Sequence, residues 1–502
     1  MALHTHRLSK SRYLAGRQCH RQLWWKVHEP RAPELTAGPG LQAIFDLGNR
    51  VGERAREDFP NATLIPLDHS NPQGAVEATR QAIAAGAPVI LEASFLEDHI
   101  FVAVDALSKE GDGWVLTEVK ATTKVKPQHV PDAAVQAHVV ERAGLPVARV
   151  ELMHLNREHR QPDQGLLFTR SDITDAVTEL RGEIPDQAKA QLRMLEGTLP
   201  DVAPGPHCTS PYECPFHARC NAPLPDHAIE DLHGIRAEKL GELHAEGIET
   251  VDQIPSDFPL TTLQARHRAS VLRDEMIVEP GLQTALAAYR YPIAMLDFET
   301  INPALPVWDG CSPFGQVPVQ FSVHTLSENG EVSHHAYLAD GEGDPRPQVA
   351  KALVGALNGA ATVLAWNAGF EKSCLGILAE SSPEHAPALL EAHDKTQDLL
   401  PVVRNHVYHP DFRGSFSIKD VVPALVPEMA YDDLEVSDGQ TASFLLERLL
   451  CRSGELSAEE RAGLREQLEA YCDHDTAVMV ALFRSLSEVA SGWRPPQTWT
   501  HP

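Results

Sequence analysis

Long apolar runs are missing from this 502-residue chain, and no stretch approaches the ~18 apolar residues that a membrane-spanning helix requires. The first residues, MALHTHRLSKSRYL, are basic but contain no apolar core of signal-peptide length. Internal repeats and low-complexity tracts are missing too, which argues against a solenoid or a disordered chain. We therefore expect a globular cytoplasmic protein with about three folded units, at ~150 residues per unit.

Positive charge is also scarce, since 43 lysines and arginines stand against 70 aspartates and glutamates, for a formal net charge of −27. Such a chain should not adhere to nucleic acid over its whole surface, so a nucleic-acid site must be local. One local source of positive charge is a segment near the N-terminus whose only acid is Glu29. Its basic residues are Arg7, Lys10, Arg12, Arg17, Arg21, Lys26 and Arg31.

Composition divides the chain into three regions and a tail. They cover residues 1–222, 223–290, 291–490 and 491–502. The first region ends in the proline- and cysteine-rich stretch DVAPGPHCTSPYECPFHARCNAPLP, and the tail has too little periodic apolar sequence to pack on its own. The second region has a helical pattern through Leu240 and Leu243, then Gly247 and a second helical start. This pattern predicts either a helical linker or half of a helix-hairpin-helix, whose backbone amides can bind phosphate.

Residues 88–124 predict a meander of three antiparallel strands, because β-branched runs alternate there with short polar breaks. Period-two alternation places Glu118 and Lys120 on one face of the third strand, with Asp105 at the end of the preceding strand beside them. Helices are predicted around this sheet, at about 40–58 and 132–144. The pattern favours a mixed sheet flanked by helices.

Asp105 and Glu118 are candidate metal ligands. Neighbouring carboxylates repel each other unless a divalent cation lies between them, and Mg²⁺ prefers oxygen ligands. Lys120 beside such an ion could orient or deprotonate a water molecule and stabilise charge during phosphodiester hydrolysis. The alternative is an exposed strand edge on which the Glu-x-Lys triplet simply faces solvent.

An Asp, a Glu-x-Lys triplet and a later helical Gln resemble, in this order, the motifs of the RecB-type PD-(D/E)XK nucleases. The residues that carry the resemblance are Asp105, Glu118, Lys120 and Gln136. It implies a restriction-endonuclease-like domain in which Gln136 belongs to the catalytic site. Glu53 stands where this family often places a metal-binding His or Glu, and Val140 replaces the tyrosine that the family has four residues after the glutamine.

Four cysteines form a second pattern. Cys208, Cys214 and Cys220 have five residues between neighbours, and Cys19 lies far upstream. Four thiolates can bind zinc or an iron–sulfur cluster, but structural zinc sites usually contain Cys-x₂₋₄-Cys pairs, and this set has none. The arrangement resembles the RecB-like nucleases in which one N-terminal and three C-terminal cysteines hold a 4Fe-4S cluster; unconnected buried thiols are the alternative. The other cysteines, Cys311, Cys374, Cys451 and Cys472, show no such spacing and are expected to be core or bystander thiols.

The third region places acids at widely separated points. The run YPIAMLDFETI predicts a strand with Asp297 and Glu299 on one face. A hairpin turning at Asn-Gly, a helix and the strand ATVLAW follow, giving the order β-β-β-α-β. Glu371 comes near the start of the next helix, and Tyr471 and Asp475 are four apart on one face of a helix near the end. Taken singly, Asp-x-Glu is more typical of a strand cap and Tyr-x-x-x-Asp of a solvated helix turn, because acids are common at protein surfaces.

Together these motifs resemble the DEDD exonucleases, which have a ribonuclease-H-like fold and bind two metal ions. The metal ligands implied are Asp297, Glu299, Glu371 and Asp475, although the family has Asp where this chain has Glu371. The resemblance makes Tyr471 the residue that orients or deprotonates the attacking water. It makes Lys419, in GSFSIKDVVPAL, and Asn367 substrate contacts, and Asp398 a supporting acid.

The whole chain resembles bacterial proteins that join a RecB-like iron–sulfur half to a DnaQ-like half. This implies an α/β (α+β) multi-domain protein, with a PD-(D/E)XK domain holding a 4Fe-4S cluster in 1–222 and a DEDDy exonuclease domain in 291–490. We expect hydrolysis of DNA, in preference to RNA, with Mg²⁺ or Mn²⁺, and the resemblance to the DEDD exonucleases implies 3′ to 5′ polarity in the third region. The whole-chain resemblance names no pathway, and protein partners in a repair or phage-defence complex are a separate expectation. Two alternatives stay open. One is a nonenzymatic nucleic-acid-binding or scaffolding protein with decayed sites, favoured by the net charge, Val140 and Glu371, and the other is a zinc-dependent regulator.

Overall fold

The computed structural model describes residues 6–68, 71–162, 164–431, 435–436 and 438–492, so the predicted tail lies almost wholly outside the described residues. The chain forms two compact units. The first comprises Met1–Pro223 and Pro303–Gly315, and the second comprises Leu224–Asn302 and Gln316–Pro502. Residues 224–290 therefore belong to the second unit, and 303–315 belong to the first.

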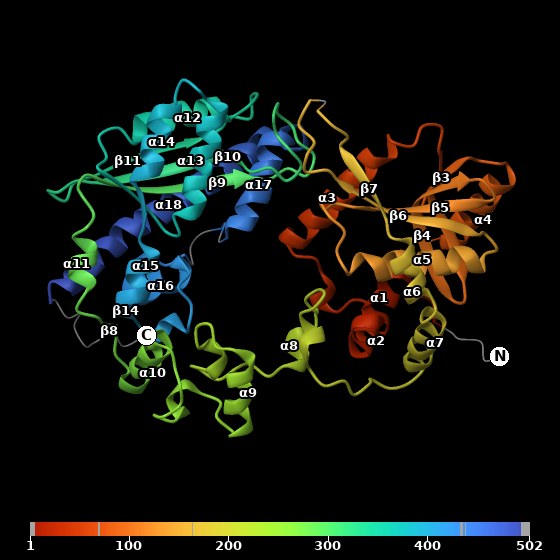
Figure 1. Ribbon diagram of the computed structural model, residues 1–502, viewed down its shortest axis with the longest axis horizontal. Helices are drawn as coiled ribbons and strands as arrows, with labels where there is room; N and C mark the ends of the chain where they lie inside the picture. Colours follow the sequence, from red (N-terminus) through yellow and green to blue (C-terminus); the bar gives the residue numbers. More distant parts are fainter. Residues whose placement is uncertain (1–5, 69–70, 163, 432–434, 437, 493–502) are drawn as a thin grey trace. The chain divides into compact units, whose positions relative to one another are not determined.

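The first unit is built on a mixed seven-stranded sheet, as expected from the sequence (Figure 1). Its strand order is β2-β3-β4-β5-β6-β7, and β1 pairs with β4. The strands are β1 (Leu8–Ser9), β2 (Thr63–Leu64), β3 (Val89–Glu97), β4 (Ile100–Glu110), β5 (Gly113–Lys120), β6 (Val147–Leu155) and β7 (Phe168–Asp172). Strands β3, β4 and β5 form the predicted antiparallel meander, whereas β5 and β6 run parallel because a helix connects them.

Helices cover both faces of this sheet. The helices of this unit are α1 (Lys10–Gln18), α2 (His20–His28), α3 (Pro39–Arg56), α4 (Pro72–Ala84), α5 (His129–Arg142), α6 (Thr174–Arg181), α7 (Ile184–Leu195) and the short α8 (His217–Cys220), which belongs to a separate small cluster. The helices predicted at about 40–58 and 132–144 are thus confirmed as α3 and α5. Leu116 of β5 faces the larger core, which contains much of α5, while Val119 faces the core that contains Val51 and Ala55 of α3. Side chains alternate along β5, so Leu116 and Val119 face the helix layers on opposite sides of the sheet.

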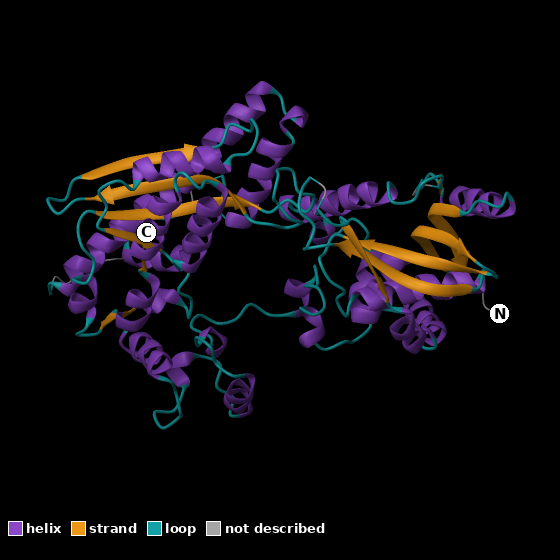
Figure 2. Ribbon diagram, turned by 45° about the horizontal axis from the view of Figure 1, so that its top comes forward, coloured by secondary structure: helices purple, strands orange, loops and turns teal. Residues whose placement is uncertain are grey.

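The second unit is built on a five-stranded sheet with the order β11-β10-β9-β12-β13. Figure 2 shows strands in orange and the helices around them in purple. The strands are β9 (Ile293–Ile301), β10 (Val317–Leu326), β11 (Val332–Leu338), β12 (Thr362–Ala365) and β13 (Thr396–Asp398). The first three are antiparallel, and β12 pairs parallel with both β9 and β13. With α12 (Arg346–Ala356) before β12, the predicted β-β-β-α-β order is confirmed.

Helices lie on both faces of this sheet as well. Besides α12, the helices of this unit are α9 (Ala237–Ala245), α10 (Thr262–Arg273), α11 (Leu282–Leu286), α13 (Gly369–Ser381), α14 (Ala386–Lys395), α15 (Leu400–His406), α16 (Ile418–Leu425), α17 (Gly439–Cys451) and α18 (Ala458–Ala490), of which α9 and α10 do not pack on the sheet. A short ladder pairs β8 (Ile277–Val278) with β14 (Val407–Tyr408). Leu296 on β9 packs with α12, α13 and α14, whereas Met295 packs with α11, α15 and α18. The long helix α18 thus crosses the face that is opposite to α12.

The segment after α9 differs from the helix-hairpin-helix prediction. The second helical start after Gly247 is only a 3-10 turn, Val251–Gln253. Pro255 follows closely, and a proline disfavours helical geometry in the residue before it, so no second α-helix forms there. None of the helices in the described part of the chain combines the length and apolar composition needed to cross a bilayer.

Candidate functional sites

Three carboxylates converge in the second unit. Asp297 and Glu299 lie on one face of β9, and α18 carries Asp475 to them across the sheet. One oxygen from each lies within 4.8 Å of the others. The structure therefore brings together three of the four acids that the sequence singles out in this region.

Burial and mutual repulsion make these acids difficult to ionise together. Burial, followed by repulsion from Asp475, raises the pKa of Glu299 to about 8. Burial, followed by repulsion from Asp475, also raises the pKa of Asp297 well above its ordinary value, and burial raises that of Asp475. Divalent cations would remove this repulsion, so the donor set fits hard metal ions.

Glu371 lies beside this cluster without belonging to it. It stands in the first turn of α13 and is buried, and its Oε2 atom has no hydrogen-bond partner among the described residues. Burial raises the pKa of Glu371 to about 8, and its charge contributes to the raised pKa of Asp297. A buried carboxylate oxygen without a partner is costly, and a metal ligand role would explain it.

Tyr471 lies one helical turn before Asp475 on α18, as predicted. The Lys419 ammonium donates to the Tyr471 hydroxyl over 3.3 Å and lies 5.2 Å from the centre of its ring. A second tyrosine, Tyr431, donates from its hydroxyl to Asp475 Oδ1 over 2.7 Å. Sequence reasoning missed Tyr431, because a single tyrosine after a 3-10 turn belongs to no motif.

Asn367 and Asp398 meet where β12 and β13 end. Asn367 has a positive φ of 66°, and its backbone N–H donates to Asp398 Oδ1 over 3.0 Å. The same oxygen accepts from the backbone N–H of Leu400 over 3.0 Å. Asp398 therefore fixes two backbone turns near the acidic cluster, and contact of Asn367 with a substrate stays a prediction.

Two of the cysteines that the sequence treats as bystanders are buried next to the acids. The Cys472 thiol donates to Asp297 Oδ2 over 3.9 Å. Burial, then the charge of Glu371, raises the pKa of Cys374 above its usual range, so this thiol is neutral at physiological pH.

A second polar cluster forms in the first unit. Lys120 donates to Glu118 Oε1 over 2.6 Å, and Gln136 of α5 donates to Glu118 Oε2 over 2.6 Å. The backbone N–H of Val119 donates to Asp105 Oδ2 over 2.6 Å. Only 1% of Glu118 is exposed, so the alternative of a solvated strand edge is wrong for this residue.

The structure corrects two expectations about this cluster. Asp105 lies within β4 and not at its end, because the ladder with β5 continues to Glu110. Glu53 is exposed on α3, and α3 packs on the sheet face of Val119, opposite to the face of Glu118. Glu53 therefore does not join these residues, although its place in the sequence suggested a metal ligand.

Two further residues join this cluster: Asp132, which belongs to no motif, and Lys10, which the sequence indicates only as part of a basic segment. Lys10, at the start of α1, lies 2.9 Å from Glu118 Oε1 and 3.1 Å from Asp132 Oδ1. Asp132 also pairs with Lys120. Although burial opposes ionisation, the ammonium groups of Lys10 and Lys120 hold the pKa of Glu118 far below its usual range. Burial and the charge of Glu118 raise the pKa of Asp105 to about 7.

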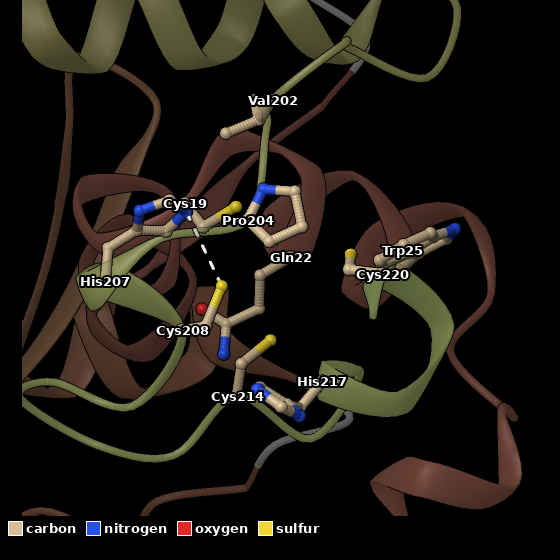
Figure 3. Close-up of a pocket in the computed structure, with 10 residues that line it drawn as sticks. All are labelled: Cys19, Gln22, Trp25, Val202, Pro204, His207, Cys208, Cys214, His217 and Cys220. Atoms are coloured by element: carbon tan, nitrogen blue, oxygen red, sulfur yellow. Dashed lines mark hydrogen bonds between the residues drawn. The ribbon is translucent and has the colours of Figure 1, made fainter. Parts of the chain in front are cut away.

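The four spaced cysteines line one pocket (Figure 3). Cys19 lies between α1 and α2, Cys208 ends the 3-10 turn Pro206–Cys208, and Cys220 ends α8. Cys214 lies between these last two, and Gln22, Trp25, His207 and His217 complete much of the wall. The structure therefore brings together residues that are nearly 200 positions apart in the sequence.

The four sulfurs of this pocket are not as close together as the ligands of a tetrahedral zinc ion. A tetrahedral zinc site has Zn–S distances of about 2.3 Å, which place its sulfur atoms about 3.8 Å apart. Among the described residues, no three of these sulfurs lie within 4.8 Å of one another. The buried Gln22 Oε1 has no hydrogen-bond partner among the described residues, and the Arg21 guanidinium donates to Cys220 Sγ over 3.7 Å. Polar groups of this kind tune anionic iron–sulfur clusters.

Comparison with known proteins gives a match for only part of the chain. A family model described as a domain of unknown function, DUF2779, matches residues 294–417. The match includes Asp297, Glu299 and Glu371 and ends before Tyr471 and Asp475. A search of curated proteins finds no match.

Proposed function

We propose that this protein is a metal-dependent nuclease whose second unit is a DEDD-type 3′ to 5′ exonuclease acting on DNA. The observation that carries the proposal is the convergence of Asp297, Glu299 and Asp475 within 4.8 Å of one another in a largely buried site. Carboxylates held this way bind the divalent ions of phosphodiester cleavage. The antiparallel β9-β10-β11 hairpins, the parallel β12 and the covering α18 are consistent with a ribonuclease-H-like fold.

The acidic cluster and Glu371 would hold Mg²⁺ or Mn²⁺. When bound, such ions activate water and stabilise the leaving oxygen. Tyr471 orients the attacking water through its hydroxyl, and Lys419 positions that hydroxyl while adding positive charge beside the substrate phosphate. Tyr431 holds Asp475 in place through its 2.7 Å hydrogen bond.

For the first unit we propose a second nuclease site of PD-(D/E)XK type, formed by Asp105, Glu118, Lys120 and Gln136. The β3-β4-β5 meander followed by α5 and the parallel β6 supports this assignment. We also propose that Cys19, Cys208, Cys214 and Cys220 hold a 4Fe-4S cluster. Such a cluster would link Cys19, at the junction of α1 and α2, to the three cysteines between Cys208 and Cys220.

A nucleic-acid-binding role without catalysis is the second candidate for the first unit. One observation favours it: both carboxylate oxygens of Glu118 already accept hydrogen bonds from side chains of the protein. In a site that has lost its catalytic function, such hydrogen bonds would hold the side chains in place. The site could then bind nucleic acid without cleaving it.

The decisive experiment is anaerobic purification of the full chain and digestion of end-labelled single- and double-stranded DNA and RNA with Mg²⁺ or Mn²⁺. Stepwise loss of nucleotides from the 3′ end, abolished by Asp297→Asn, supports the proposal. Asp257→Asn is the matched control, because Asp257 is exposed and lies in the same unit. If no substrate loses nucleotides with either metal, the exonuclease assignment is wrong.

A further inference from the structure

Lys10 occupies the middle of the acidic cluster in the first unit. Its ammonium contacts Glu118 Oε1 at 2.9 Å and Asp132 Oδ1 at 3.1 Å. Lys120 contacts the same two carboxylates, and Gln136 donates to Glu118 Oε2. Oε1 of Glu118 therefore accepts from two ammonium groups and Oε2 accepts from one amide, so a metal ion that binds Oε1 must displace one of the two ammonium groups.

Lys10 is the donor that can leave with the least disturbance. Gln136 is fully buried and also donates to the carbonyl oxygen of Asp132 over 3.2 Å. Lys120 shares a strand face with Glu118 at a spacing of two residues, so it stays near the carboxylate in any rotamer. Lys10 instead reaches the cluster from a separate segment, through a flexible four-carbon stem.

The backbone around Lys10 is firmly anchored. Leu8 and Ser9 pair with Ile100 and Phe101 of β4, and the Ser9 side chain caps α1 by accepting from the backbone N–H of Arg12. Leu8 is fully buried. The fold therefore holds the backbone of Lys10 beside this cluster. The ammonium can move away by rotation of the side chain, without unfolding of the segment.

We propose that Lys10 is an intramolecular counter-cation that competes with a divalent metal ion for Glu118, so that loading of this site requires its ammonium to withdraw. The proposal rests on the metal site proposed for the first unit. It has a functional consequence: the site in the first unit loads at a higher metal concentration than it would without the Lys10 ammonium.

Metal affinity tests this directly. The full chain carrying Asp297→Asn and Asp475→Asn, which silences the other site, is titrated with Mn²⁺ while free Mn²⁺ is followed by its EPR signal. Lys10→Gln should bind Mn²⁺ about tenfold more tightly or better, because a charge-assisted contact no longer competes. Lys10→Arg should match the parent, and so should Lys189→Gln, whose lysine side chain is 69% exposed on α7 and pairs only weakly with Asp186.

Two results would overturn the proposal: a Mn²⁺ affinity that Lys10→Gln leaves unchanged, or a gain that survives the addition of Glu118→Gln. A second measurement needs no change at Lys10. Acylation of the Lys10 amine, followed by mass spectrometry, should increase when Mn²⁺ saturates the chain, and unchanged labelling also contradicts the proposal. Neither assay measures cleavage, so a failure of the proposed nuclease activity is distinguishable from a failure of this inference.

Discussion

Replacement of Glu299 by glutamine should stabilise the metal-free protein at alkaline pH and have little effect at acid pH. Burial, then repulsion from Asp475, raises the pKa of Glu299 from 4.5 to about 8 in the folded protein. A carboxyl group with a raised pKa binds its proton more tightly in the folded state than in the unfolded state. Its contribution to stability is therefore complete below pH 4.5 and is lost as the pH rises towards 8.

The size of this loss follows from the two pKa values. Each tenfold change in proton affinity corresponds to about 1.4 kcal/mol, so the full change would be about 5 kcal/mol. Interactions with the neighbouring acids share this energy, and we expect Glu299→Gln to be more stable than the parent by about 3–5 kcal/mol at pH 9. At pH 4.5 the two proteins should agree within about 0.5 kcal/mol, because the parent carboxyl is then protonated in the folded state and half protonated in the unfolded state.

Hydrogen exchange of peptides from β9 and α18, measured in EDTA, reports this difference for the second unit alone. Glu328→Gln is the control, because this acid is exposed in the hairpin turn between β10 and β11. Mg²⁺ at 100 times its Kd should reduce this difference, because it stabilises the parent by about 2.7 kcal/mol and the variant lacks one of the metal-binding carboxylates. Equal protection of parent and Glu299→Gln at pH 9 in EDTA would refute the reasoning, and so would an equal gain at pH 4.5.

Three further predictions concern the other groups. Anaerobically purified protein should be brown, with a visible sulfur-to-iron absorption that Cys208→Ser abolishes and Cys451→Ser retains; colourless protein with one equivalent of zinc would contradict the cluster. Tyr431→Phe should lower kcat for nucleotide release about tenfold with little change in KM, because Asp475 loses its 2.7 Å hydrogen bond, and an unchanged kcat would exclude a positioning role. With the second unit silenced by Asp297→Ala, residual cleavage should fall ~100-fold or more on Lys120→Ala, measured on end-labelled DNA; cleavage that persists would place the activity elsewhere.

The secondary structure of this protein follows largely from local sequence patterns. Period-two alternation located the β3-β4-β5 meander and put Glu118 and Lys120 on one face, and the Asn-Gly turn located the β10-β11 hairpin. Helical spacing placed Tyr471 and Asp475 on one face of α18. These features depend on neighbours within a few residues, which is why the sequence alone was sufficient.

Motif order also indicated which distant residues should meet, although it could not show that they do. The convergence of Asp475 with Asp297, and of Cys19 with the three later cysteines, is a property of the folded chain. The same reasoning misplaced Glu53, because a position on a helix does not reveal which face of the sheet that helix covers.

Only the tertiary structure decided the charge balance of the sites. The pairing of β1 with β4 delivers Lys10 to Glu118, which lies 108 residues further along the chain, and the loop after α16 brings Tyr431 to Asp475. Periodicity carries no information on such contacts, because they depend on long-range packing. Sequence determined which residue types are available and on which strand or helix face they lie. Packing determined which of them share a buried, low-dielectric site, where each neighbouring charge changes what the site can bind.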